Sequence, residues 1–109
     1  MIGLEICAEV TVRVNLIKDV SVSRPWLETP DAWVTTGDAL DPAAALRIAA
    51  EEMITLLQQR LQLTFEEAYM LMSARGDVQI CQILGPGSFP VTTRAVFPRL
   101  ALFDNTLTF

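Results

Sequence analysis

The sequence contains no histidine, and this absence excludes more chemistry than any other feature of its composition. Without imidazole, neither a Ser-His-Asp nor a Cys-His catalytic arrangement can be built within the chain, and an imidazole-based zinc site is excluded as well. The two cysteines, Cys7 and Cys81, lie far apart and form no CxxC pair. Because no calcium-loop spacing is present either, we predict no metal-binding residues in this chain.

Basic residues are also scarce, since eight Lys and Arg stand against thirteen Asp and Glu, for a net charge of −5. No basic cluster is present to bind nucleic acid by counterion release. No apolar run approaches the roughly 20 residues that span a bilayer, and nothing at Met1 resembles a signal peptide. We therefore expect a soluble, cytoplasmic protein in which Cys7 and Cys81 are buried, reduced thiols.

Hydrophobic residues, in contrast, are abundant and make up 51% of the 109 residues. This share is more than a single small domain usually needs, because such a domain has a large surface relative to its core. The surplus must be exposed or covered by another surface. We therefore predict an apolar interface, either with a second copy in a homo-oligomer or with a partner chain.

A first helix is predicted over residues 42–62. Asp41 followed by Pro42 is typical of a helix start, with the carboxylate as N-cap and proline in the first turn. Apolar residues then recur at steps of three and four, which places them on one face. This face is expected to consist of Leu46, Ala50, Met53, Leu57 and Leu61.

A second helix is predicted over residues 65–75. Thr64 and Glu67 have the spacing of a capping box, in which each side chain accepts a hydrogen bond from the other residue's backbone amide. Gly76 is expected to end this helix in the left-handed conformation. The expected apolar face of the helix consists of Phe65, Ala68, Tyr69, Leu71 and Met72.

Strict alternation of apolar and polar residues predicts a half-buried antiparallel strand over residues 4–17. Shorter runs rich in β-branched residues predict strands over 32–36, 78–84 and 91–97. We therefore expect one domain over 1–109 of the α+β class. Its antiparallel β-sheet would form half of a sandwich-like structure, with a two-helix insertion packed on it.

From Val10 onward the sequence resembles the C-terminal portion of the acetamidase/formamidase family. The resemblance is carried by residues 10–18, 27–30 and 44–53, and most specifically by 66–82, where a Ser-x-x-Gly-Asp turn joins a helix to a strand. The family hydrolyses small linear amides such as formamide or acetamide to carboxylate and ammonia. The resemblance implies that the family's divalent metal and histidine-bearing pattern lie upstream of this chain, in the missing half, so that no cofactor binds here.

Three residues at element junctions are the candidate substrate-binding residues if the chain completes an amidase site. Asp77 lies at the helix-to-strand turn, where its carboxylate could hydrogen-bond an amide or orient a metal ligand. Gln82 could act similarly from the strand, and Glu28 lies in a proline-braced loop that suits a site residue. Each also has an ordinary interpretation, as a turn residue, a polar residue of a sheet and a surface charge, respectively. No catalytic residue is predicted.

Three interpretations of the chain stay open. It could be the subunit of a split amidase, completed by a separate N-terminal polypeptide that provides the rest of a site for a small amide. It could be a remnant that self-associates and catalyses nothing. It could instead be a non-catalytic oligomerisation or binding module that retains the fold. In each case we expect the isolated chain to be inactive.

Overall fold

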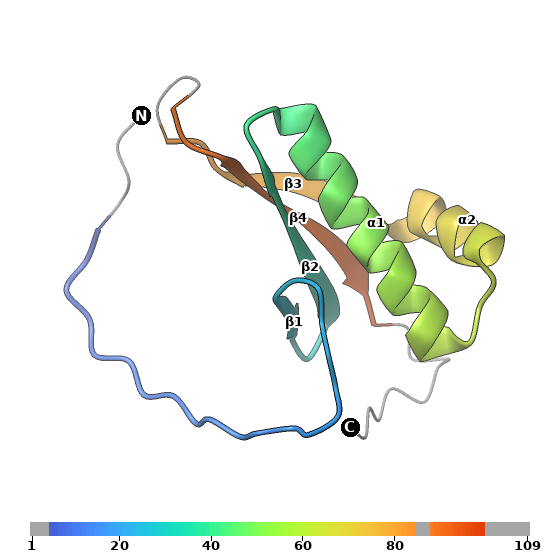
Figure 1. Ribbon diagram of the computed structural model, residues 1–109, viewed down its shortest axis with the longest axis horizontal. Coiled ribbons are helices and arrows are strands. Elements are labelled where there is room, and N and C mark those ends of the chain that lie inside the picture. The colour runs from blue at the N-terminus through green and yellow to red at the C-terminus, as the bar shows by residue number, and fades with distance from the viewer. Residues whose placement is uncertain (1–4, 85–87, 100–109) are drawn as a thin grey trace.

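The computed structural model describes residues 5–84 and 88–99, which form a four-stranded antiparallel sheet and two helices (Figure 1). The strand order is β1-β2-β4-β3. The elements are β1 (Trp26–Glu28), β2 (Ala32–Ala39), α1 (Pro42–Leu61), α2 (Phe65–Arg75), β3 (Asp77–Gln82) and β4 (Val91–Pro98). The predicted α+β class is therefore confirmed, with both helices inserted between β2 and β3.

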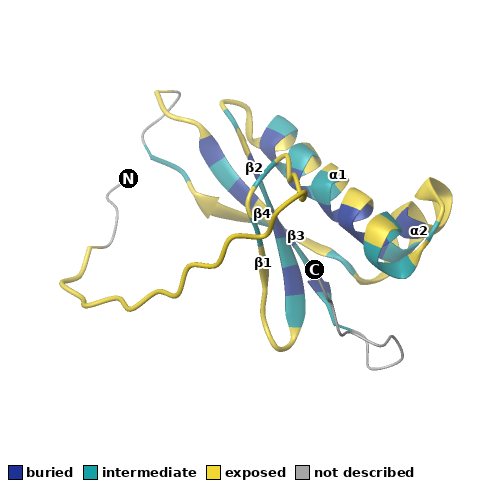
Figure 2. Ribbon diagram, turned by 60° about the horizontal axis from the view of Figure 1, so that its bottom comes forward, coloured by how far each residue is buried: buried dark blue, intermediate teal, exposed yellow. Residues whose placement is uncertain are grey.

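Helix α1 covers one face of the sheet and forms the core with it (Figures 1 and 2). Alternate residues of β2 and β4 are buried on this face, as the period of two requires. Their register pairs Trp33 with Phe97 and Thr35 with Ala95. The buried residues of α1 are Ala45, Ala49, Met53, Ile54, Leu56 and Leu57.

Small residues let α1 approach the sheet closely. Ala45 and Ala49 are fully buried, whereas the predicted face of the helix placed Leu46 and Ala50 inward; both are only partly buried. The helix is thus rotated by one residue in its first turns. Two buried hydroxyls fix it there: Thr35 donates to the carbonyl oxygen of Ala49 and Thr93 to that of Ala45, each at 2.7 Å.

The predicted helix starts are confirmed. Asp41 accepts a hydrogen bond from the amide of Ala44 at 3.0 Å. In the capping box of α2, the hydroxyl of Thr64 accepts from the amide of Glu67 at 3.2 Å, and the Glu67 carboxylate accepts from the amide of Thr64 at 2.9 Å. The bonds satisfy amides that would otherwise lack a partner in the first helical turn.

The predicted left-handed cap at Gly76 is wrong. Gly76 is extended, with φ −72° and ψ 157°, because α2 continues directly into β3 without a reversing loop. The left-handed residue ends α1 instead, at Gln62, where φ is 55°. The prediction that Phe65 and Tyr69 of α2 face the core is also wrong, because each side chain is 55% exposed. Only the side of the helix with Ala68 and Met72 faces the core.

The strand limits differ from the predicted ones by a few residues. β2 does not end at residue 36 as predicted but continues to Ala39, because Gly37 and Asp38 remain paired with β4. β3 spans Asp77–Gln82 instead of 78–84, and β4 extends by one residue to Pro98. The short edge strand β1 lies in the proline-flanked segment and pairs only with β2.

The predicted strand over residues 4–17 is the main error. Residue 4 lies outside the described residues, and residues 5–17 pair with no other strand and leave the body as an extended arm (blue in Figure 1, yellow in Figure 2). Ile6 and Val14 are 88% and 86% exposed. Alternation of apolar and polar residues gives a segment the two faces of a strand. It does not supply the neighbouring strand that the hydrogen-bond ladder needs.

The predicted burial of the two thiols is also wrong, because Cys7 and Cys81 are both exposed and free. Cys7 lies on the arm and Cys81 at the end of the edge strand β3. Among the described helices, none is long and apolar enough to cross a membrane.

Candidate functional site

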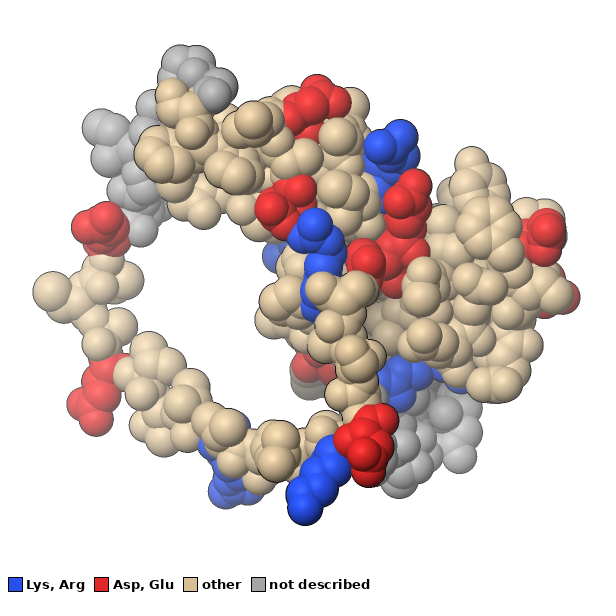
Figure 3. Space-filling view, viewed as in Figure 1, with Lys and Arg blue, Asp and Glu red and all other residues tan. Residues whose placement is uncertain are grey.

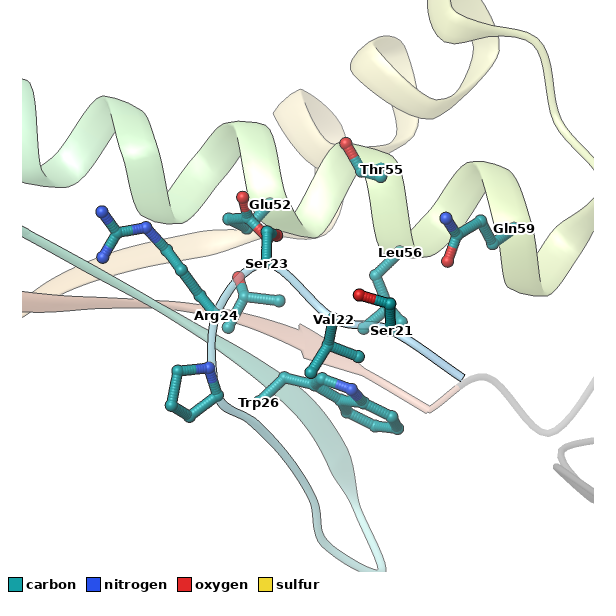
Figure 4. Close-up of a pocket in the computed structure, with 11 residues that line it drawn as sticks. Ser21, Val22, Ser23, Arg24, Trp26, Glu52, Thr55, Leu56 and Gln59 are labelled. Carbon is teal, nitrogen blue, oxygen red and sulfur yellow. The ribbon is translucent and has the colours of Figure 1, made fainter. Parts of the chain in front are cut away.

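A pocket of about 270 Å³ lies between the segment that precedes β1, helix α1 and strand β2 (Figure 4). Hydroxyl and amide groups gather in it together with one carboxylate, one guanidinium and the ring of Trp26. The lining residues are Ser21, Val22, Ser23, Arg24, Pro25, Trp26, Thr35, Glu52, Thr55, Leu56 and Gln59.

The charged groups of this pocket are engaged with other protein groups. The Ser23 hydroxyl donates to the Glu52 carboxylate at 2.6 Å, and Arg24 forms an ion pair with Asp38 of β2. These contacts hold the segment before β1 against α1 and β2. Glu52 is the one carboxylate of the lining, so the pocket has no acid–base pair and can at most bind a small polar molecule.

Glu28 lies beside two arginines rather than in this pocket. Its carboxylate is 3.1 Å from Arg99 Nη1. It also interacts with Arg60, whose guanidinium carbon lies 5.0 Å from the centre of the Trp26 ring. Burial lowers the pKa of Arg60, and the charge of Glu28 offsets part of this effect. In this structure Glu28 therefore joins β1 to the end of α1 and to Arg99.

Asp77 and Gln82 mark the two ends of β3. The Asp77 carboxylate accepts a hydrogen bond from Gln79 Nε2 at 2.6 Å. Gln82 follows an irregularity in the pairing of β3 with β4 and is exposed. Asp77 and Gln82 are five positions apart, about 17 Å along a strand.

The structure does not bring the three predicted site residues together. Asp77 and Glu28 occupy opposite edges of the sheet, three strand spacings or about 14 Å apart. They also face opposite sides: Glu28 pairs with the inward residue Trp33, and Asp77 pairs with Val96 on the other side of the sheet. A shared substrate site within this chain is not formed. Their predicted roles in binding substrate stay predictions.

The sheet face opposite α1 carries a polar network that the sequence did not reveal. Arg94 Nε donates to Gln79 Oε1 at 2.8 Å, and Gln79 in turn donates to Asp77. We call this side the open face and define it by the residues that pair across it: Leu27, Ala32, Val34, Thr36, Asp38, Asp77, Gln79, Gln82, Thr92, Arg94, Val96 and Pro98. The one sequence signal for this position of Arg94 is the alternation in β4, which puts Arg94 on the other face of the strand from Thr93 and Ala95.

The described residues contain no group of three or more His, Cys, Asp or Glu side chains that could hold a metal ion. On the side of the molecule seen in Figure 3, basic and acidic side chains are interspersed and form no single-sign patch. This distribution gives no support to a nucleic-acid interface there.

No family model and no curated protein matches this sequence. Solved structures do match. A crystal structure of acetamidase from Bacillus halodurans is 35% identical over 68% of this chain, with a TM-score of 0.60. A predicted acetamidase/formamidase from the thermophile Thermoanaerobacter tengcongensis is 28% identical over 75% of this chain, with a TM-score of 0.65. The chain spans 24% and 26% of those two chains, respectively, so the similarity that residues 10–18 and 66–82 suggested is confirmed for a segment of such proteins.

Proposed function

We propose that this chain, which is similar to a segment of acetamidase and acetamidase/formamidase structures, forms part of a hydrolase of small linear amides. The reaction would convert an amide such as formamide or acetamide to carboxylate and ammonia. The observation that carries the proposal is the 35% identity with the Bacillus halodurans acetamidase over 68% of this chain. Because the chain spans 24% of that acetamidase, the activity is proposed for the completed enzyme.

We further propose that the chain is inactive by itself. Amide hydrolysis needs an activated water molecule or nucleophile. The sequence has no histidine to serve as a general base, and residues 5–84 and 88–99 contain no carboxylate cluster that fits a divalent metal. The residues present therefore do not fit a catalytic metal. We assign such a metal to the part of the enzyme that this chain does not match, and no catalytic step to this chain.

The open face is the surface through which the chain would meet the rest of such an enzyme. It combines partly buried valines, Val34 and Val96, with the Arg94–Gln79–Asp77 hydrogen-bond network. A carboxylate such as Asp77 can accept the N–H of an amide, and Gln82 or Glu28 could do so from other positions. Of these three, Asp77 is favoured, because its orientation is fixed by Gln79.

Two measurements test this function. The first is ammonia release from formamide and acetamide by the purified chain, with and without added divalent metal, which should equal the blank. The second is a chimera in which this chain replaces the matched segment of the Bacillus halodurans acetamidase. A folded chimera should hydrolyse acetamide, and Asp77→Asn should lower its kcat/KM. The control Asp31→Asn, in an exposed turn, should not. A chimera that folds but releases no ammonia would contradict the proposal.

A non-catalytic binding or oligomerisation module is the second candidate function. The observation that favours it is the pocket before β1, whose two charged side chains are already engaged, Glu52 by Ser23 and Arg24 by Asp38, and perform no chemistry there. If this candidate is correct, the chimera stays inactive even when it folds, and the chain alone forms a stable assembly.

A further inference from the structure

Residues 5–17, which we call the arm, expose large apolar side chains along their whole length. Val10 and Val12 are 77% and 74% exposed, and Leu16 is 83% exposed. The apolar side chains alternate with Glu5, Cys7, Glu9, Thr11, Arg13 and Asn15. An extended segment with this period has one apolar face and one polar face, and its backbone groups have no ladder partner here. The arm therefore has the pattern of a β-strand but is not paired with any strand of this sheet.

The outer edge of β3 has the complementary features. β3 is the last strand of the sheet, with β4 on its inner side. Val78 and Ile80 point to the helix side and are 42% and 48% exposed. Beside Val78, between the two helices, lies a groove of about 290 Å³. Its lining residues are Ala50, Ile54, Tyr69, Met72, Ser73, Gly76 and Val78.

We propose that the arm of one copy of this chain pairs as an added antiparallel strand with β3 of a second copy, and that the contact is reciprocal. An open strand edge is a template for such pairing. The valines of the arm would then line up with Val78 and Ile80 beside the groove, and the polar residues of the arm would extend the open face. The pairing goes beyond the proposed amidase role: it uses the backbone edge and the helix side of β3, and of the β3 residues that select its register only Asp77 belongs also to the open face.

Charge selects the register. In the register that places Arg13 opposite Asp77, Val12 lies opposite Val78 and Val10 opposite Ile80. A shift of four residues would place Glu9 opposite Asp77, and like charges directly opposite each other are destabilising. Any odd shift would turn the valines to the open face. A shift of two residues would keep the apolar residues in line but would put the uncharged Thr11 or Asn15 opposite Asp77. Only the first register therefore matches the edge strand in both apolar pattern and charge.

The arm reaches the β3 of a second copy more readily than its own. The strand order puts β1 and β3 at opposite edges, and an arm antiparallel to β3 would run parallel to β1. Parallel strands need a crossover of a dozen or more residues. Only residues 18–25 connect the arm to β1, and they would have to cross about 19 Å, or four strand spacings. Contacts at Ser23 and Arg24 already hold part of this connection on the body.

Sedimentation equilibrium tests the pairing with matched variants. The unaltered chain should be a dimer at micromolar concentration. Val12→Lys, on the apolar face of the arm, should weaken the dimer about ten-fold or more, because a lysine would face the groove. Thr11→Lys adds the same charge one residue away, on the polar face, and should leave the dissociation constant nearly unchanged. Both positions are exposed in the single chain, so neither variant should affect its folding.

Charge reversal tests the register. Arg13→Glu and Asp77→Arg should each weaken the dimer by about three-fold, and the double variant should recover most of the loss. Amide hydrogen exchange should show protection of residues 10–14 in the dimer. A monomer at high micromolar concentration would overturn the proposal, whether its arm is protected or not. A dimer with an unprotected arm, or one equally sensitive to Val12→Lys and Thr11→Lys, would overturn it as well.

Discussion

Gly37 lies where α1 comes closest to the sheet, and replacing it by alanine should destabilise the fold strongly. A Cβ atom at this position would lie 2.3 Å from the carbonyl oxygen of Ala45 and 2.7 Å from the amide nitrogen of Ala49. It would also lie 3.1 Å from the Thr93 hydroxyl. The two shortest contacts are to helix backbone, which cannot rotate away. α1 must therefore move outward.

The size of the effect follows from this geometry. Restoring an ordinary contact of roughly 3.4 Å requires a helix shift of about 1 Å. Overpacking of this kind costs about 1–3 kcal/mol. The shift also weakens the hydrogen bonds from Thr35 and Thr93 to α1, each worth about 1 kcal/mol. The expected loss is about 3 kcal/mol, or a melting temperature lower by roughly 12–20 °C.

Urea and thermal unfolding followed by circular dichroism measure this loss. The control is Thr92→Ala, on the open face of the same sheet, which should cost less than about 1 kcal/mol. If Gly37→Ala were as stable as the unaltered chain to within about 0.5 kcal/mol, α1 would not press on β2 as described. Such a result would show that the close approach of Gly37 to Ala45 and Ala49 does not hold.

Three further substitutions probe other parts of the fold by the same unfolding measurements. Thr93→Val removes the hydroxyl that donates to Ala45 and should cost about 1–2 kcal/mol, whereas Thr93→Ser should recover part of it. Thr64→Ala breaks the capping box of α2 and should cost about 1 kcal/mol, and equal stability would contradict the cap's importance. Leu57→Ala empties a fully buried position and should cost about 2–5 kcal/mol; a loss under 1 kcal/mol would place Leu57 outside the core.

Features whose cause lies within a few residues could be predicted from the sequence. The N-cap at Asp41 and the capping box of Thr64 and Glu67 depend on spacing alone, and both are present as expected. The periodic segments from Pro42 to Gln82 also gave the correct order of two helices and a strand. Local chemistry determines these elements, and neighbouring segments do not override it.

Features that depend on a distant neighbour could not be predicted. The rotation of α1 that buries Ala45 and Ala49 depends on Gly37, whose contact with the helix no pattern reveals. The arm has the strongest strand pattern in the sequence and yet forms no strand, because the pattern does not state which sheet it pairs with.

The candidate site shows the same limit. The position of Asp77 at a turn is visible in the sequence. Its contact with Gln79, which in turn accepts from Arg94, follows from the register of β3 on β4, and no local signal fixes that register. The pocket before β1 depends on where a segment rich in serine and proline lies across α1. Contacts across the fold create both features.

The most direct test of the account is the release of ammonia from formamide and acetamide by the purified chain alone, in the presence of Zn²⁺, Mn²⁺ or Mg²⁺. With no histidine in the sequence and no metal-binding cluster in the described residues, the account predicts a rate equal to the blank with every metal. Metal-dependent turnover above the blank, removed by a chelator and restored by the metal, would contradict it.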